Sequence, residues 1–249
     1  MDFTRLRSSY FDDQRDRLET LITKVGERKN AVAAGRVVPA DGDIPIGAGR
    51  SLHAAVLFLD ISSFSSRPSS TQLEQENLLR FLTIFFAQVI RVIEDYGGTV
   101  EKNTGDGMMA YFVNKGDVSA EQAAVAASLT ITYCAENLVD PIMTAVGAQP
   151  FRFRICIDNG PITVANVGAP QRFGSLVAVG TAANLACKML SFANPGDILI
   201  GETVLSRLPQ RWADDYVRLR TVESGWVYAS SGRPYPIYEY AGRWTVPRP

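Results

Sequence analysis

Two short segments each place a carboxylate at the end of an apolar run, and they constrain the fold more than any other feature. In the first, Leu57-Phe58-Leu59 leads into Asp60; in the second, Asp106 stands between two glycines in Thr104-Gly105-Asp106-Gly107. The apolar run predicts a buried strand, and the glycines predict a tight turn between paired strands. If the two strands are neighbours, the aspartates can bind two divalent cations, which prefer hard oxygen ligands. This arrangement indicates phosphoryl chemistry on a nucleotide.

Composition excludes several classes of partner and compartment. The chain has 249 residues, 46% of them apolar, and a net charge of -1. Nothing in this balance favours a nucleic acid partner. The three cysteines are widely spaced in apolar contexts, which predicts reduced core residues rather than disulfides: Cys134, Cys156 and Cys187. The start has no apolar signal segment, and the longest apolar stretch (81–93) is too short to span a bilayer. We therefore expect a cytoplasmic protein without direct membrane contact.

The chain divides into three parts on pattern alone. Residues 1–35 are charged and weakly amphipathic, which predicts an N-terminal helical extension. Residues 36–50 contain several glycines and prolines and are expected to form a linker. Residues 51–249 then alternate strand and helix patterns, as expected for one domain with a sheet covered by helices.

Capping and turn signals place the elements of this domain. Thr71 and Glu74 form a capping-box pattern that opens a long helix ending at Gly97-Gly98, and Ser119 opens a second helix running to about residue 137. Asp158-Asn159-Gly160-Pro161 predicts a turn between two strands. The expected strands are 53–59, 99–103, 108–113, 151–157, 162–167, a run ending at 179, and short runs near 198–200, 216–219 and 236–240, with a further helix over 181–190.

The residues after Asp60 have the composition of a phosphate-binding loop. Their backbone N–H groups could bind phosphate oxygens where the chain turns toward a helix: Ser62, Ser63, Phe64 and Ser65. Taken singly, these signals have simpler explanations. Asp-Gly is the commonest choice at a hairpin tip, and one aspartate after a strand is often only a solvated cap.

A third segment, Val167 to Leu190, changes this balance. It contains Val179-Gly180-Thr181-Ala182-Ala183-Asn184-Leu185-Ala186-Cys187-Lys188. Together with the Asp60 segment, the Gly-Asp-Gly hairpin and the Gly160-Pro161 turn, in this order, it resembles the catalytic domain of the class III nucleotide cyclases over residues 53–240. The resemblance implies an α/β (α+β), ferredoxin-like domain with a mostly antiparallel sheet covered by helices. It also implies a head-to-tail homodimer whose active sites are built from both subunits.

The resemblance assigns roles residue by residue. It implies metal ligation by Asp60, Ile61 and Asp106, with two Mg²⁺ or Mn²⁺ ions in each site. It implies that Lys102, four residues before Asp106, reads the base of a nucleoside triphosphate. It further implies that Asn184 positions the ribose and that Lys188 stands where the family usually has a transition-state arginine.

Two departures bear on the substrate. Val177, seven residues before Asn184, replaces an aspartate that reads the adenine amino group, and valine cannot accept a hydrogen bond. Lys188 keeps the charge of arginine but lacks its planar fork. The chain is similar to the pyrimidine cyclases of bacterial anti-phage (Pycsar) systems, whose cyclic nucleotide activates a separate effector. This similarity favours UTP as substrate. A cytidylate cyclase, an adenylate cyclase with an altered base pocket, and a non-catalytic nucleotide-binding regulatory domain remain alternatives.

Other residues have structural interpretations. His53, the only histidine, is expected to be structural. Arg152 and Arg154 alternate with Phe153 along a strand and share one face. They are expected to be surface charges, with contact to the substrate phosphates as the alternative. Three aromatic residues at helical spacing are expected in the core: Phe81, Phe85 and Phe86.

Overall fold

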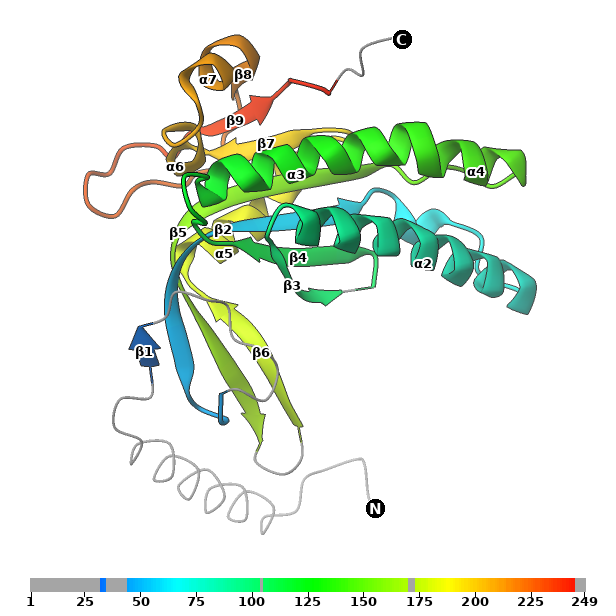
Figure 1. Cartoon of the computed structure of the whole chain (residues 1–249), viewed down its shortest axis with the longest axis horizontal. Helices are drawn as coiled ribbons and strands as arrows, with labels where there is room; N and C mark the ends of the chain where they lie inside the picture. Colours follow the sequence, from blue (N-terminus) through cyan, green and yellow to red (C-terminus); the bar gives the residue numbers. More distant parts are fainter. Residues whose placement is uncertain (1–31, 35–43, 104, 170–172, 245–249) are drawn as a thin grey trace.

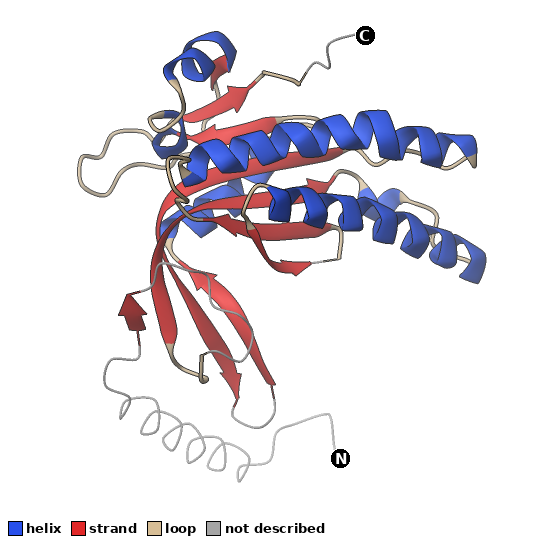
Figure 2. Ribbon diagram, in the orientation of Figure 1, coloured by secondary structure: helices blue, strands red, loops and turns tan. Residues whose placement is uncertain are grey.

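The fold is one twisted nine-stranded sheet with helices on both faces (Figures 1 and 2). The computed structural model describes residues 32–34, 44–103, 105–169 and 173–244. The strands are β1 (Val32–Ala34), β2 (Gly49–Ile61), β3 (Thr99–Asn103), β4 (Gly107–Phe112), β5 (Phe153–Ala169), β6 (Phe173–Val179), β7 (Ile198–Gly201), β8 (Val217–Arg220) and β9 (Ile237–Tyr240). The main path is β3-β4-β2-β5-β7-β9-β8, with β1 paired to β2 and β6 paired to β5. All pairs are antiparallel except β1–β2 and β5–β7, which confirms the predicted mostly antiparallel sheet.

Two long helical segments cover one face of this sheet. They are α2 (Gln72–Asp95) and the continuous run of α3 (Ala120–Cys134), a π-helical turn (Ala135–Val139) and α4 (Asp140–Ala145). Thr71 and Glu74 make both bonds of the predicted capping box, and Ser119 accepts a hydrogen bond from the N–H of Gln122. Phe85 and Phe86 of α2 are buried in the core on this face, and Phe81 packs against that core, as predicted.

A shorter helix, α5 (Thr181–Met189), covers the opposite face. Its buried side chains are mostly small, so the helix lies close to β2 and β5. Residues 222–235 complete the hydrophobic core on this face and contribute Trp226, Tyr228 and Tyr235 to it. The remaining helices are short: α6 (Glu202–Leu205), α7 (Gln210–Tyr216), and two 3-10 turns (Phe64–Ser66 and Leu190–Phe192).

The predicted turn at Asp158–Pro161 is wrong. β5 runs without interruption from Phe153 to Ala169, and β2 pairs with it over thirteen residues of its own length. Asp158 and Asn159 are buried, and Pro161 stands opposite His53. A proline is tolerated because β7 pairs with β5 only up to Ile157 and β6 only from Thr163, so no second strand needs its N–H here. The turn-forming residues therefore mark the stretch of β5 between its pairing with β7 and its pairing with β6.

The N-terminal predictions are corrected in part. Val32–Ala34 form a strand that pairs with Gly49–Ser51, where the sequence predicted the end of a helix and a linker. Residues 1–31 and 35–43 lie outside the described residues. The free cysteines also differ from the prediction at one position, since Cys156 is buried but Cys187 is exposed. No helix in the described ranges is long and apolar enough to cross a membrane.

Candidate active site

The two predicted metal aspartates meet at one end of the sheet. Asp60 lies near the end of β2 and pairs with Gly107 on β4, and the N–H of Ile61 donates to the carbonyl oxygen of Asp106 at 2.9 Å. Both aspartates are half-buried, and the Asp60 side chain is 22% exposed. The long antiparallel pairing of β2 and β4 thus brings together two carboxylates that are 46 residues apart in the sequence.

The donor set fits a magnesium or manganese pair bound with a substrate. Mg²⁺ is usually held by one or two carboxylates together with substrate phosphates. Across the described ranges, no group of three or more His, Cys, Asp or Glu side chains could hold a metal ion without such help. Ile61 has a hydrocarbon side chain, which is buried in the core, so this residue can offer only its backbone carbonyl to a metal ion. Asp60 and Asp106 are therefore the side chains that would hold the ions.

Arg154 occupies the site in a way that the sequence analysis missed. It stands directly opposite Asp60 in the β2–β5 pairing, and its Nε and Nη2 donate to Asp60 Oδ2 at 2.9 and 2.7 Å. Its Nη1 donates to the carbonyl of Ala193 at 3.3 Å. Arg154 is thus no free surface charge, whereas Arg152 is largely exposed and pairs with Asp140 at 2.9 Å. The signal that could have found it is the register of β5, which fixes which arginine faces Asp60.

The loop after Asp60 presents unused backbone donors. Ser63 has a φ of 55°, a left-handed conformation found at no other non-glycine residue of the described ranges. Within those ranges no hydrogen bond uses the N–H groups of Ser63, Phe64 or Ser65. Consecutive N–H groups around a left-handed residue form a concave anion-binding nest. The Ser62 N–H, in contrast, donates to the Arg152 carbonyl, while the buried Ser62 Oγ has no partner among these residues.

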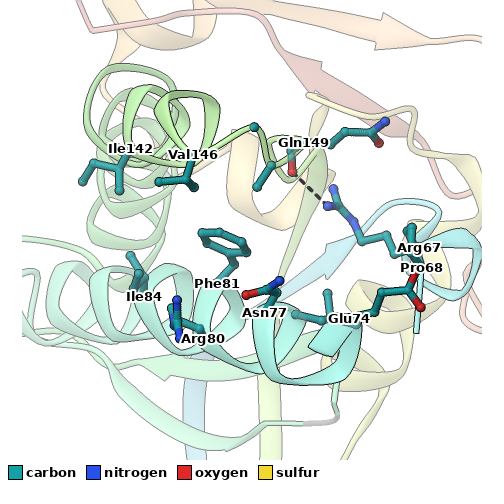
Figure 3. Close-up of a pocket in the computed structure, with 13 residues that line it drawn as sticks. Arg67, Pro68, Glu74, Asn77, Arg80, Phe81, Ile84, Ile142, Val146 and Gln149 are labelled. Atoms are coloured by element: carbon teal, nitrogen blue, oxygen red, sulfur yellow. Dashed lines mark hydrogen bonds between the residues drawn. The ribbon is translucent and has the colours of Figure 1, made fainter. Parts of the chain in front are cut away.

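Arg67, at the end of this loop, is bound to the segment that precedes β5. Arg67 donates to the carbonyl oxygens of Gln149 and Pro150 at 2.9 and 2.7 Å, and its guanidinium lies 4.3 Å from the centre of the Phe151 ring. Figure 3 shows Arg67 reaching toward Gln149 at the border of a groove of about 530 Å³ between α2 and α4. None of the predicted site residues lines this groove. These contacts fix the end of the loop that carries the nest.

The predicted base and ribose residues lie on other elements. Lys102 sits beside an irregularity in β3, with Nζ 3.1 Å from Glu101 Oε1; its side chain is 38% exposed, and that of Glu101 is 1% exposed. Asn184 and Lys188 are both exposed on α5, one helical turn apart. Val177 lies on β6 opposite Ala165 and is half-buried. The strands of Lys102 and Val177 are not neighbours in the sheet.

Comparison with known proteins decides the family. Residues 48–224 match the model of the adenylate and guanylate cyclase catalytic domain. The chain belongs to this family. The cyclase match covers Asp60, Asp106, Asn184 and Lys188, and it ends before the last strand of the sheet.

The relatives of the cyclase domain differ in the activity for which they are named. An uncharacterized protein of Mycobacterium tuberculosis (strain ATCC 25618 / H37Rv) is 30% identical over 200 residues, which is 77% of this chain but only 33% of that protein. A uridylate cyclase of Rhodovulum sp. (strain MB263) is 30% identical over 63% of this chain and 65% of its own length. An adenylate cyclase of Mycobacterium tuberculosis is 30% identical over 66% of this chain and 34% of its own length.

Solved structures agree on the fold of the cyclase domain. The guanylyl cyclase Cya2 superimposes with a TM-score of 0.64 at 25% identity, over 79% of this chain and 95% of that one. The adenylyl cyclase CyaB from P. aeruginosa superimposes with a TM-score of 0.61 at 26% identity, over 79% of this chain and 97% of that one. The domain is therefore a nucleotide cyclase domain by sequence and by fold, and relatives of three base specificities resemble it.

Proposed function

We propose that the chain is a pyrimidine nucleotide cyclase that converts UTP to 3′,5′-cyclic UMP and pyrophosphate. The observation that carries the cyclase part is the pairing that sets Asp60 and Asp106 on neighbouring strand ends, with the Ser63–Ser65 nest directly after Asp60. The uridylate cyclase of Rhodovulum supports the choice of base, and adenylate cyclases of similar identity make it the finer part of the proposal.

The reaction joins the ribose 3′ oxygen to the α-phosphorus, breaks the bond to the β-phosphate oxygen and passes the hydroxyl proton to water. Two Mg²⁺ or Mn²⁺ ions, when bound, would lower the pKa of the 3′-hydroxyl and offset phosphate charge. Asp60 and Asp106 hold them, and the N–H groups of Ser63, Phe64 and Ser65 bind phosphate oxygens. Asn184 orients the ribose, and Lys188 offsets the charge that develops during transfer. No protein nucleophile is required.

Arg154, the partner of Asp60, also has a role in this proposal. A guanidinium bound to Asp60 Oδ2 neutralises much of the charge of that carboxylate, so a metal ion held by Asp60 would compete with it. Once released, the guanidinium would be free to pair with a phosphate oxygen of the triphosphate. Arg154 would thus exchange a carboxylate for a phosphate as the site fills.

Replacing Arg154 should separate metal binding from turnover. We expect Arg154→Met to bind Mn²⁺ about fivefold more tightly in the absence of nucleotide, because a competing cation worth about 1 kcal/mol is gone. Turnover should fall at least about tenfold, because the triphosphate loses a charged donor. Electron paramagnetic resonance of free Mn²⁺ and steady-state rates would measure the two effects. Weaker Mn²⁺ binding together with unchanged turnover would show that this role is wrong.

Base selection is proposed to depend on Val177 and Lys102. Lys102 only donates, and can serve O2 or O4 of uracil, O2 or N3 of cytosine, or N1 of adenine. A purine amine placed against Val177 would lack an acceptor, which costs about 1–3 kcal/mol. This loss disfavours ATP. It leaves CTP as the second candidate, followed by ATP in an altered pocket, and a silent nucleotide-binding regulatory domain if catalysis is absent.

Competition among nucleotides tests the base. In an equimolar mixture of UTP, CTP, ATP and GTP with Mn²⁺, we expect cyclic UMP to accumulate fastest. Val177→Asp should raise the rate for ATP relative to UTP about tenfold, because it supplies the missing acceptor. Val179→Asp, two residues along the same strand and 58% exposed, is the matched control and should shift nothing. ATP turnover as fast as that of UTP and CTP in the unmodified protein would refute the pyrimidine assignment while leaving the cyclase assignment intact.

The remaining parts of the proposal concern assembly and biological role. Asn184 and Lys188 point to the surface of α5, which suits residues that complete a site in a second copy. We therefore propose a head-to-tail homodimer with composite sites. The resemblance to Pycsar cyclases supports a role in anti-phage defence in the cytoplasm, where the cyclic nucleotide would activate a separate effector.

A further inference from the structure

A second cavity lies beside the start of α5. It measures about 270 Å³, opens to the surface and is lined by residues of β5, α5, Thr203 of α6 and the segment 226–235. Three aromatic residues line it, Trp226, Tyr228 and Tyr235, with Leu185 and Ala182 from α5. None of the proposed metal, phosphate, base or ribose residues lines it. The cavity is thus distinct from the candidate active site.

Asp158 places a buried carboxylate at this cavity. The residue is 2% exposed, and its Oδ1 accepts three hydrogen bonds: from the Asn159 N–H at 2.9 Å, the Thr203 hydroxyl at 2.9 Å and the Tyr235 hydroxyl at 2.8 Å. Its Oδ2 accepts none from the described residues. Those residues also supply no lysine, arginine or histidine that pairs with Asp158; Arg233, two residues before Tyr235, is bound to Glu202.

The Asp158 carboxylate has no counterion among the described residues, and this indicates what kind of ligand the cavity would bind. Burial raises the pKa of Asp158 to about 6, and a cation beside the carboxylate would favour its ionised form. A buried charge without a counterion is strongly unfavourable, and a cation beside it recovers much of that loss. Aromatic faces add attraction for organic cations within about 6 Å of a ring centre. Tyr228 and Tyr235 have ring centres 5.2 Å apart, and those of Trp226 and Tyr235 are 6.4 Å apart, so the three rings adjoin one another. The Arg233 guanidinium already lies over one face of Tyr228, 4.7 Å from the ring centre.

We propose that this cavity is a binding site for a small organic cation, an alkylammonium ion of about the size of choline. The cation would lie against Trp226, Tyr228 and Tyr235 and offset the charge of Asp158. Binding does not depend on the proposed cyclase function. An effect of the bound cation on cyclase activity would depend on it, because Ala182 and Leu185 line the cavity from α5 and the exposed side of the same helix carries Asn184 and Lys188.

A charged ligand and its neutral isostere provide the test. Choline and 3,3-dimethylbutan-1-ol have nearly the same shape and differ in charge. We expect choline to bind the full-length protein saturably, by calorimetry and by a change in Trp226 emission, and at least about tenfold more tightly than the alcohol. Equal affinities, or no saturable choline binding to the folded protein, would overturn the proposal.

Variants separate charge from folding. Asp158→Asn keeps the Oδ1 acceptor for its three donors and removes the charge, so it should weaken choline at least about tenfold and leave the alcohol unchanged. Val227, which lines the cavity and is 58% exposed, allows a matched pair that spares the core. Val227→Lys places a competing ammonium at the cavity and should weaken choline, whereas Val227→Glu should not. Unchanged choline affinity in both Asp158→Asn and Val227→Lys would contradict the site, whatever the cyclase assay shows.

Discussion

Asp60→Ala and Asp106→Ala are each expected to lower cyclase turnover at least about a hundredfold. The two carboxylates hold one pair of ions, so losing either one removes the stabilisation of the transferring phosphate, worth several kcal/mol. Asn at either position should also be severely impaired, because a neutral amide binds divalent cations poorly. Product formation with Mn²⁺ measures all four variants.

Folding must be checked separately for these variants. Asp60→Ala leaves the Arg154 guanidinium without its carboxylate, and we expect a loss of about 1–3 kcal/mol in the free energy of unfolding. Asp60→Asn keeps an acceptor and should be milder. Asp117→Ala, at an exposed acidic residue, is the control and should keep full activity. If either Ala variant of the pair is folded and keeps more than about a tenth of the turnover, the assigned metal site is wrong.

Mixing two inactive proteins is expected to restore activity. In the proposed dimer, Asp60 and Asn184 serve one site from different subunits, so Asp60→Ala and Asn184→Ala homodimers should each be nearly inactive. A heterodimer of the two has both lesions in one site and leaves the other whole. Random exchange gives about half heterodimers with one good site of two, so roughly a quarter of the original activity should return.

Subunit exchange itself needs an independent readout. Differently tagged subunits that co-purify after mixing would show that heterodimers have formed. If they form and the mixture stays as inactive as its parents, the site is not shared between subunits. Activity per subunit should also fall on dilution below the dimer dissociation constant.

Much of the site could be predicted because its signals are local. The apolar run before Asp60 and the glycines around Asp106 identified two strands, and the adjacency of those strands is confirmed. The cap at Thr71 is likewise set by residues three positions apart, and it forms as predicted. Local patterns suffice where the determining contacts lie within a few residues.

The errors fall where distant pairing decides. Asp158-Asn159-Gly160-Pro161 has turn chemistry, yet β2 pairs with all four residues and keeps them in a continuous strand. Arg154 was assigned to the surface because nothing near it in sequence reveals that Asp60, 94 residues away, stands opposite. The uncompensated charge of Asp158 was hidden for the same reason, since Thr203 and Tyr235 reach it from much later in the chain.

The central claim is that Asp60 and Asp106 support cyclisation of a nucleoside triphosphate. The most direct measurement incubates the purified protein with Mn²⁺ and each of the four nucleoside triphosphates separately, identifies the products by mass and counts pyrophosphate. We predict that at least one triphosphate, UTP first, yields a 3′,5′-cyclic monophosphate and pyrophosphate in equal amounts, and that the Asp60→Ala protein yields neither. A folded, dimeric preparation that forms no cyclic nucleotide from any of the four would contradict the account.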